Sequence, residues 1–167
     1  MTPATDPRPR PAPGRAEGPT FAFHHVWRIA APTPRVFEVL AAADRYAEWW
    51  PQIRSVTREG PDDGTALVRS VLPIPLTLHL HREVSDAETG HLAVRIAGDL
   101  CGWARWQVRP ALGAAGAPAT VADYRQTVVV AQPRLRRLAP PARLLFIANH
   151  SWMMRSGERG LRRHLDC

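Results

Sequence analysis

Hydrophobic and polar residues alternate along the middle of the chain with a period of two. From Leu76 to Val84 the apolar residues fall on one face of a strand, while Thr77, His79 and His81 fall on the other face. The same alternation recurs in neighbouring segments that are separated by turns or prolines. The strands expected from this pattern cover residues 21–30, 53–58, 65–72, 75–84, 92–96, 102–108 and 121–130.

Three other segments have a helical pattern. Thr33 can cap a short helix that begins at Pro34, because the first helical position favours proline. A second short helix or turn is expected in DRYAEWWP, which starts at Asp44 and is closed by Pro51. The segment FIANHSWMMRSGERGL, residues 146–161, predicts a long C-terminal helix.

The predicted order is therefore one strand, two short helices, six successive strands and one long helix. Strands at hairpin spacing favour an antiparallel sheet, so the expected fold class is α+β. The last helix must bury its apolar side on that sheet. A curved sheet of about seven strands that grips one long helix leaves a cavity between them, and such cavities commonly hold ligands.

The length of 167 residues suits one domain, which we place at residues 19–167. Residues 1–18 are rich in Pro and Arg and lack large apolar side chains after Met1, so we expect a disordered tail there. That tail has no apolar segment typical of a secretory signal, and no later stretch is apolar for the length of a membrane span. We therefore expect a soluble, cytoplasmic protein, either a monomer or a homodimer.

The formal net charge of +7 raises the question of nucleic-acid binding. All 22 basic residues are Arg and none is Lys, a composition typical of a GC-rich genome, and the charges are spread along the chain. We interpret them as a solvated surface, and nucleic acid is the least favoured partner. The absence of Lys excludes Schiff-base chemistry and lysine-bound pyridoxal phosphate. The two Cys and seven His residues have no metal-binding or disulfide spacing, so we expect no metal and no cofactor.

His150 is the main candidate for a working residue. On the last helix the wet side carries Arg155, Glu158, Arg159 and Arg162, and His150 lies near the centre of the opposite, apolar arc beside Phe146, Met153 and Met154, with Asn149 at the edge. A buried imidazole needs a partner, and burial lowers its pKa, so His150 should be neutral at pH 7. Two interpretations remain open: a packing histidine bonded to the sheet, or a cavity residue that meets a ligand or acts as acid or base.

Several sheet residues can share the cavity with His150. Tyr124 and Gln126 alternate in step with the apolar residues of their strand, so both should point inward. They either contact a ligand or lie at the rim of a water-filled groove. Trp106 either forms a flat wall on which a ligand can stack or packs in the core. Trp50 is expected at the mouth of the cavity. The direction of Arg69 cannot be read from its strand; an inward Arg69 would polarise a carbonyl or enolate, and an outward one would be solvated.

The order of elements, together with VFEVLAAADRYAEWWPQI, AGDLCGWARWQV and FIANHSWMMRSGERGL, resembles the START-like SRPBCC superfamily with its helix-grip fold. The last two segments are similar to its polyketide cyclase/dehydrase-like branch. The resemblance covers about residues 20–165. It implies a hydrophobic cavity in a polyketide cyclase- or aromatase-like protein of secondary metabolism, or in a non-catalytic carrier of a lipid, quinone or polyketide.

These considerations give two sets of candidate residues. The catalytic candidates, for moving a proton next to a carbonyl and stabilising the enolate, are His150, Tyr124 and Arg69. The ligand-binding candidates are Trp106, Gln126, Phe146, Asn149, Met153, Met154 and Trp50. Retained binding without conversion in a His150→Ala variant would favour the enzyme, and loss of affinity alone would favour the carrier.

Overall fold

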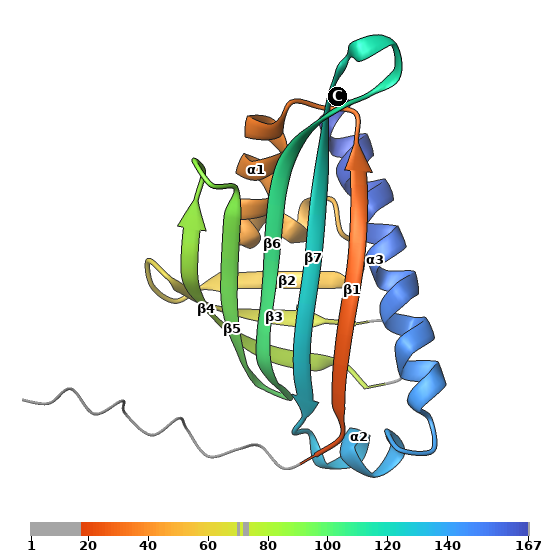
Figure 1. Ribbon diagram of the computed structural model, residues 1–167. Helices are drawn as coiled ribbons and strands as arrows, with labels where there is room; N and C mark the ends of the chain where they lie inside the picture. The colour runs from red at the N-terminus through yellow and green to blue at the C-terminus, as the bar shows by residue number, and fades with distance from the viewer. Residues whose placement is uncertain (1–17, 70, 72–73, 167) are drawn as a thin grey trace, which may run out of the picture.

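A seven-stranded antiparallel sheet forms the body of the protein, as shown by a computed structural model that describes residues 18–69, 71 and 74–166 (Figure 1). The strands are β1 (Thr20–Ile29), β2 (Ile53–Arg58), β3 (Asp63–Val68), β4 (Leu76–Asp86), β5 (His91–Gly98), β6 (Leu100–Leu112) and β7 (Pro118–Val130). Their order across the sheet is β1-β7-β6-β5-β4-β3-β2. The sheet curves so strongly that β2 and β3 cross behind β6 and β7 in Figure 1.

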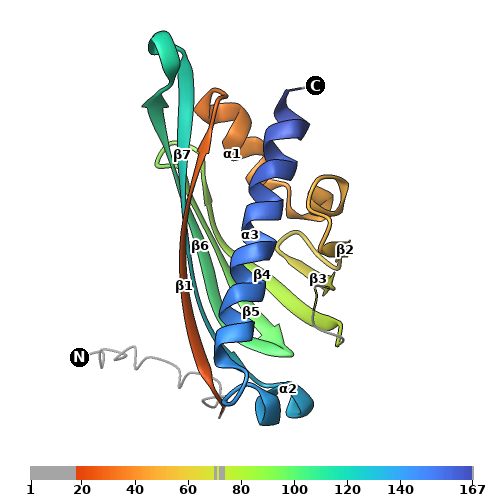
Figure 2. The ribbon, with the colours of Figure 1, turned by 90° about the vertical axis from the view of Figure 1, so that its right-hand side faces the viewer.

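Helices close the open side of this curved sheet. They are α1 (Thr33–Ala41), η1 (Ala43–Glu48), α2 (Pro133–Leu138) and α3 (Arg143–Leu165), whereas η2 (Ala114–Gly116) lies in the β6–β7 loop. Figure 2 shows α3 between β1 on one side and β2 and β3 on the other. The predicted α+β, helix-grip architecture is thereby confirmed. The predicted tail, residues 1–18, falls outside the described residues except for Gly18.

Local structure differs from the sequence-based expectation at two helix starts. Helix α2 was not expected; it begins at Pro133, and the side chain of Gln132 accepts a hydrogen bond from the backbone N–H of Leu135 at 2.7 Å. Thr33 does not cap α1, because its hydroxyl lies 3.2 Å from that of Thr120 on β7. Helix α2 is thus capped by glutamine, a residue type that is not among the preferred caps. The Thr33 hydroxyl instead contacts a residue that is distant in the sequence.

Strand alternation produces the core in the way the sequence predicts. The buried residues are Ala104, Trp106 and Val108 on β6, and Thr120, Ala122, Tyr124, Gln126, Val128 and Val130 on β7. Trp106 packs on Trp27 of β1, with ring centroids 4.7 Å apart. His79 and His81 are exposed on the other face of β4, as predicted. The concave face of the sheet is therefore mainly apolar and aromatic, and Thr120, Tyr124 and Gln126 are the buried residues of β7 that bring polar groups to it.

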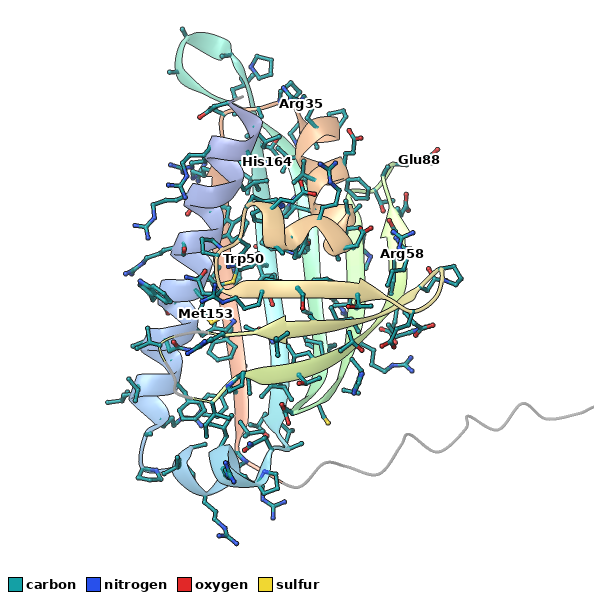
Figure 3. All side chains as sticks on the ribbon, turned by 180° about the vertical axis from the view of Figure 1, so that it is seen from behind. Arg35, Trp50, Arg58, Glu88, Met153 and His164 are labelled. Carbon is teal, nitrogen blue, oxygen red and sulfur yellow. The ribbon has the colours of Figure 1, made fainter. Side chains whose placement is uncertain are left out.

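Helix α3 lies very close to the Trp49–Trp50 segment that leads into β2. A Cβ atom on Gly160 would stand 1.8 Å from the carbonyl oxygen of Trp49, and one on Gly157 would stand 2.5 Å from the indole of Trp50. The indole Nε1 of Trp50 donates a hydrogen bond to the carbonyl of Met153 at 3.1 Å, and the two residues lie beside each other in Figure 3. The two glycines thus allow α3 to close one end of the sheet.

Candidate ligand-binding cavity

A cavity of about 290 Å³ lies between α3 and the concave face of the sheet. Its wall is mainly apolar: residues from all seven strands form one side, and residues of α1, η1, α2 and α3 form the rest. All the ligand-binding candidates line it, namely Trp50, Trp106, Gln126, Phe146, Asn149, Met153 and Met154, together with Tyr124 and His150. The structure therefore brings nine of the ten sequence-predicted site residues to one cavity, while their roles stay predictions.

Three polar residues of the wall, Tyr124, Gln126 and His150, form one hydrogen-bonded cluster. His150 Nε2 lies 2.8 Å from the side-chain oxygen of Gln126, which also accepts from the Tyr124 hydroxyl at 3.0 Å. Tyr124 and Gln126 are two residues apart on β7 and therefore point to the same face. Strand pairing supports them from both sides, because Tyr124 lies opposite Trp106 on β6 and opposite His25 on β1.

His25 belongs to the same cluster, although the sequence analysis did not single it out. Its Nε2 lies 3.2 Å from Nδ1 of His150. The signal was present in FAFHHVWRIA, because strand alternation places His25 on the face of Phe23 and the buried Trp27. The adjacent His24 points the other way and lies 3.0 Å from the carboxylate of Asp123.

Chemistry sets the direction of the hydrogen bonds in this cluster. The amide oxygen of Gln126 can only accept, so His150 must carry its proton on Nε2 and donate it there. The neutral ring then accepts at Nδ1, and the donor is Nε2 of His25. Both nitrogens of His150 are therefore engaged within the protein. Among the described residues Gln126 Nε2 has no partner, and it is the donor that this cluster leaves for a ligand.

The surroundings keep both histidines neutral. Burial, reinforced by His25, lowers the pKa of His150 to about 3. Burial also lowers the pKa of His25, with further lowering from His24 and Arg155. Burial raises the pKa of Tyr124, so that its phenol stays protonated. At neutral pH the cluster offers hydrogen bonds without any net charge.

Aromatic rings hold the histidine in place. The ring of Phe23 stacks on His150 with centroids 3.7 Å apart and planes 8° from parallel. Phe146 in turn stacks on Phe21 at 5.6 Å, next to the end of the cavity formed by α2. On the sheet, Trp106 packs against Tyr124 at 4.6 Å. These contacts restrict the rotation of the His150 and Tyr124 rings, so the cluster is rigid before any ligand enters.

Asn149 adds a second polar feature to the wall. Its Oδ1 is buried without a hydrogen-bond partner among the described residues, and its Nδ2 contacts the sulfur of Met153 at 3.7 Å. A buried acceptor without a partner costs free energy. Asn149 thus provides an acceptor in the same wall that provides the donor of Gln126.

The far end of the cavity is charged. Here Arg58 pairs with Asp44 at 3.2 Å and Arg82 pairs with Asp62 at 3.0 Å, and all four residues line the cavity. These pairs are largely exposed, so they contribute little stability. The cavity therefore runs from a wet, charged end near the β2–β3 turn to a dry, aromatic end near α2.

Arg69, one of the catalytic candidates, is not among the residues that line this cavity, and its catalytic role stays a prediction. Strand β3 ends at Val68, whose side chain is buried against the cavity, and the next side chain, that of Arg69, is exposed. The backbone N–H of Arg69 donates to the carbonyl of Gln52 at 2.8 Å. The residue directly after an inward-facing strand position points to the other side, so the structure does not bring Arg69 together with the other nine candidates.

The described residues hold no cluster of three or more His, Cys, Asp or Glu side chains that could bind a metal ion. In that same part of the chain, no helix has the length and the apolar character that crossing a membrane requires. The site is thus described by its apolar wall and its four hydrogen-bonding side chains, Tyr124, Gln126, His150 and His25.

The chain belongs to the family described as polyketide cyclase / dehydrase and lipid transport, which matches residues 20–165. No curated protein sequence matches the chain. This membership agrees with the curved sheet, the long C-terminal helix and the apolar cavity described above.

Solved structures with the same fold include an aromatase/cyclase and proteins whose names state no reaction. The Zhui aromatase/cyclase from Streptomyces sp. R1128 is 17% identical with a TM-score of 0.64, over 88% of this chain and 94% of that one. A protein from Thermus thermophilus is 17% identical with a TM-score of 0.68, over 88% and 97%. A START superfamily protein from Mycobacterium smegmatis is 12% identical with a TM-score of 0.63, over 87% and 97%. At these identities the likeness shows the fold alone.

Proposed function

We propose that the protein binds a compact, apolar small molecule that carries a carbonyl oxygen. The observation that supports this most directly is the state of Gln126. Its oxygen is held by His150 and Tyr124, so its Nε2 is left as a fixed donor on an apolar wall. A fixed donor without a protein partner is matched by a ligand acceptor, and a carbonyl oxygen is the acceptor that suits an apolar ligand.

The shape of the cavity narrows the class of ligand. Its volume of about 290 Å³ lies at the lower end of the range for ligand pockets, roughly 300–1,000 Å³. Trp50 and Trp106 provide flat walls on which rings can stack. A ring-containing polyketide or quinone suits these features better than a lipid with two long chains. The family description and the aromatase/cyclase among the structural relatives support the polyketide class.

The experiment that tests this proposal compares two glutamines. Gln126→Leu removes the cavity donor, whereas Gln107→Leu makes the same change on the outer face of β6, where Gln107 donates to the carbonyl of Thr89. Binding of aromatic polyketides and quinones, measured by quenching of tryptophan fluorescence, should weaken about tenfold in Gln126→Leu, the worth of one hydrogen bond. It should be unchanged in Gln107→Leu. Equal affinities of both variants, or no binding by the unsubstituted protein, would contradict the proposal.

Conversion of the bound ligand is a second candidate function, of the cyclase or aromatase type. The observation in its favour is the continuous hydrogen-bonded path from Tyr124 through Gln126 and His150 to His25, which joins the cavity to a partly exposed ring. Its weakness is that His150, with both nitrogens engaged and a pKa of about 3, is a poor base at neutral pH. The arrangement therefore supports binding and orientation better than proton abstraction.

A His150→Gln variant distinguishes conversion of the ligand from binding alone. Glutamine preserves a side-chain donor near Gln126 but cannot take a proton. If the protein only binds, affinity falls a few-fold and no product forms with either form of the protein. If it converts the ligand, the unsubstituted protein yields product by mass spectrometry, and His150→Gln loses turnover by more than it loses affinity.

A further inference from the structure

The outer side of the first half of α3 is apolar, which is unusual for a helix on a protein surface. Successive helical residues are about 100° apart, so Leu144, Leu145, Ala148 and Trp152 share the side opposite Phe146 and His150. Leu144 is 82% exposed, Leu145 54% and Trp152 43%. We call these four residues the outer α3 face. An ordinary amphipathic surface helix carries polar residues at such positions.

No described helix or strand covers this face. Figure 2 looks at the molecule from the side of α3, and the helix runs along the front with the sheet behind it. Leu138, at the end of α2, is 53% exposed and lies at the same end of the molecule as the start of α3 (Figure 1). A further exposed apolar side chain therefore lies at the α2 end of the molecule, and exposed apolar surface of this kind marks an interaction site.

The part of the sequence that contains this face carries charges of one sign. Residues 124–157 contain no Asp or Glu, while exposed arginines occur at Arg134, Arg136, Arg137, Arg143 and Arg155. Arg143 donates to the carbonyl of Thr20 and covers the ring of Phe21, and no carboxylate among the described residues pairs with it. A surface with leucines and a tryptophan amid arginines is complementary to something both apolar and negatively charged.

We propose that the outer α3 face docks on the surface of an anionic lipid bilayer. Leucine side chains would enter the boundary between headgroups and acyl chains, and Trp152 suits the same depth, where tryptophan is enriched. The arginines would pair with lipid phosphates. A second copy of the chain is the less suitable occupant, because two such faces would oppose arginines with arginines without an intervening carboxylate.

Docking in this orientation places the cavity on the side of α3 that faces away from the bilayer. The opposite side of the same helix carries Phe146, Asn149, His150 and Met153, all of which line the cavity. One helix therefore separates the bilayer from the cavity. This surface proposal goes beyond the proposed function and does not depend on which ligand the cavity holds.

The test uses two leucines that are almost equally exposed. Leu144 is 82% exposed at the start of α3, and Leu112 is 83% exposed at the end of β6, next to the β6–β7 loop. Leu144→Glu and Leu112→Glu therefore change net charge and exposed apolar area alike, and neither position is packed, so both variants should keep the melting temperature of the unsubstituted protein. Sedimentation with vesicles of equal parts phosphatidylglycerol and phosphatidylcholine, and with pure phosphatidylcholine, measures binding.

We expect binding to the phosphatidylglycerol vesicles, weakened by salt, and much less to pure phosphatidylcholine. Leu144→Glu should reduce the apparent affinity about tenfold, and Leu112→Glu should leave it within twofold. Three results would overturn the proposal: no binding to anionic vesicles, equal loss in both variants, or a dimer in native mass spectrometry that Leu144→Glu dissociates without any vesicle binding.

Discussion

The imidazole rings of His25 and His150 meet at 3.2 Å, although 125 residues separate them in the chain. His25 donates to Nδ1 of His150, and His150 donates its own Nε2–H to the side-chain oxygen of Gln126. The pair therefore has a direction, and this direction determines which group of the cluster is left for a ligand. It also means that His150 is held in one tautomer by protein groups rather than by the ligand.

The tautomer and charge of His150 can be measured directly. Because burial lowers its pKa to about 3, nitrogen NMR should show a neutral ring with the proton on Nε2 from pH 7 down to about pH 4. In His25→Phe, which removes the donor at Nδ1, the Nδ1 signal should shift toward that of an unbonded nitrogen. Protonation of His150 above pH 5 would contradict the assignment.

The low pKa of His150 should also make the protein less stable in acid. Between about pH 6.5 and pH 3 the unfolded chain binds a proton at this position and the folded chain does not, so the free energy of unfolding falls as the pH falls. One such group contributes a slope of at most about 1.4 kcal/mol per pH unit. His25, whose pKa is also lowered, acts in the same direction.

Urea unfolding of His150→Gln across this pH window should therefore show a shallower pH dependence than that of the unsubstituted protein. The control is His79→Gln, which removes an exposed histidine from the outer face of β4 and should leave the slope unchanged. Parallel curves for all three proteins would show that His150 takes up its proton equally in both states.

Gly160→Ala should destabilise the protein strongly. Alanine usually favours a helix over glycine by about 1 kcal/mol, but here its methyl group would lie 1.8 Å from the backbone oxygen of Trp49. We expect a loss of about 3 kcal/mol, which for a chain of this size lowers the melting temperature by roughly 6–12 °C. Ser151→Ala on the same helix should change it by less than about 2 °C. A stabilised Gly160→Ala would mean that α3 lies farther from Trp49.

Asn149→Leu should make the ligand-free protein more stable. It removes a buried acceptor that has no partner and replaces it with a side chain of similar size, a change worth about 1 kcal/mol in favour of folding. If a ligand hydroxyl or N–H bonds to Oδ1, the same variant should bind that ligand about tenfold more weakly. Loss of stability in Asn149→Leu would show that Oδ1 has a partner in solution, such as a water molecule.

The fold could be predicted from the sequence because alternation and proline positions act locally. Each strand carries its own period of two, and the polar side of α3 is set by its charged residues. The face of each strand was therefore readable wherever one side was clearly apolar, as at Tyr124 and Gln126. It was not readable at Arg69, because apolar residues occur on both sides of the segment TALVRSVL.

The partners within the site could not be predicted in the same way. The sequence places His150 on the inner side of α3 but contains no sign of which strand residue it meets. Its contact with His25 depends on β1 pairing with β7 rather than with β2, its neighbour in the chain. Similarly, the apolar outer side of α3 was hidden by the arginines farther along the helix, which made the whole outward side look polar.

The pairing of β1 with β7 has a consequence for how the protein folds. Thr20 pairs with Val129 and Ile29 with Thr120, so the first strand finds its neighbour only after most of the chain has been made. Contacts this distant in sequence slow folding, because the entropy of closing a long loop is lost before the contact forms. The cavity draws its cluster from β1, β7 and α3, and during synthesis the cluster therefore cannot form before α3 has been made.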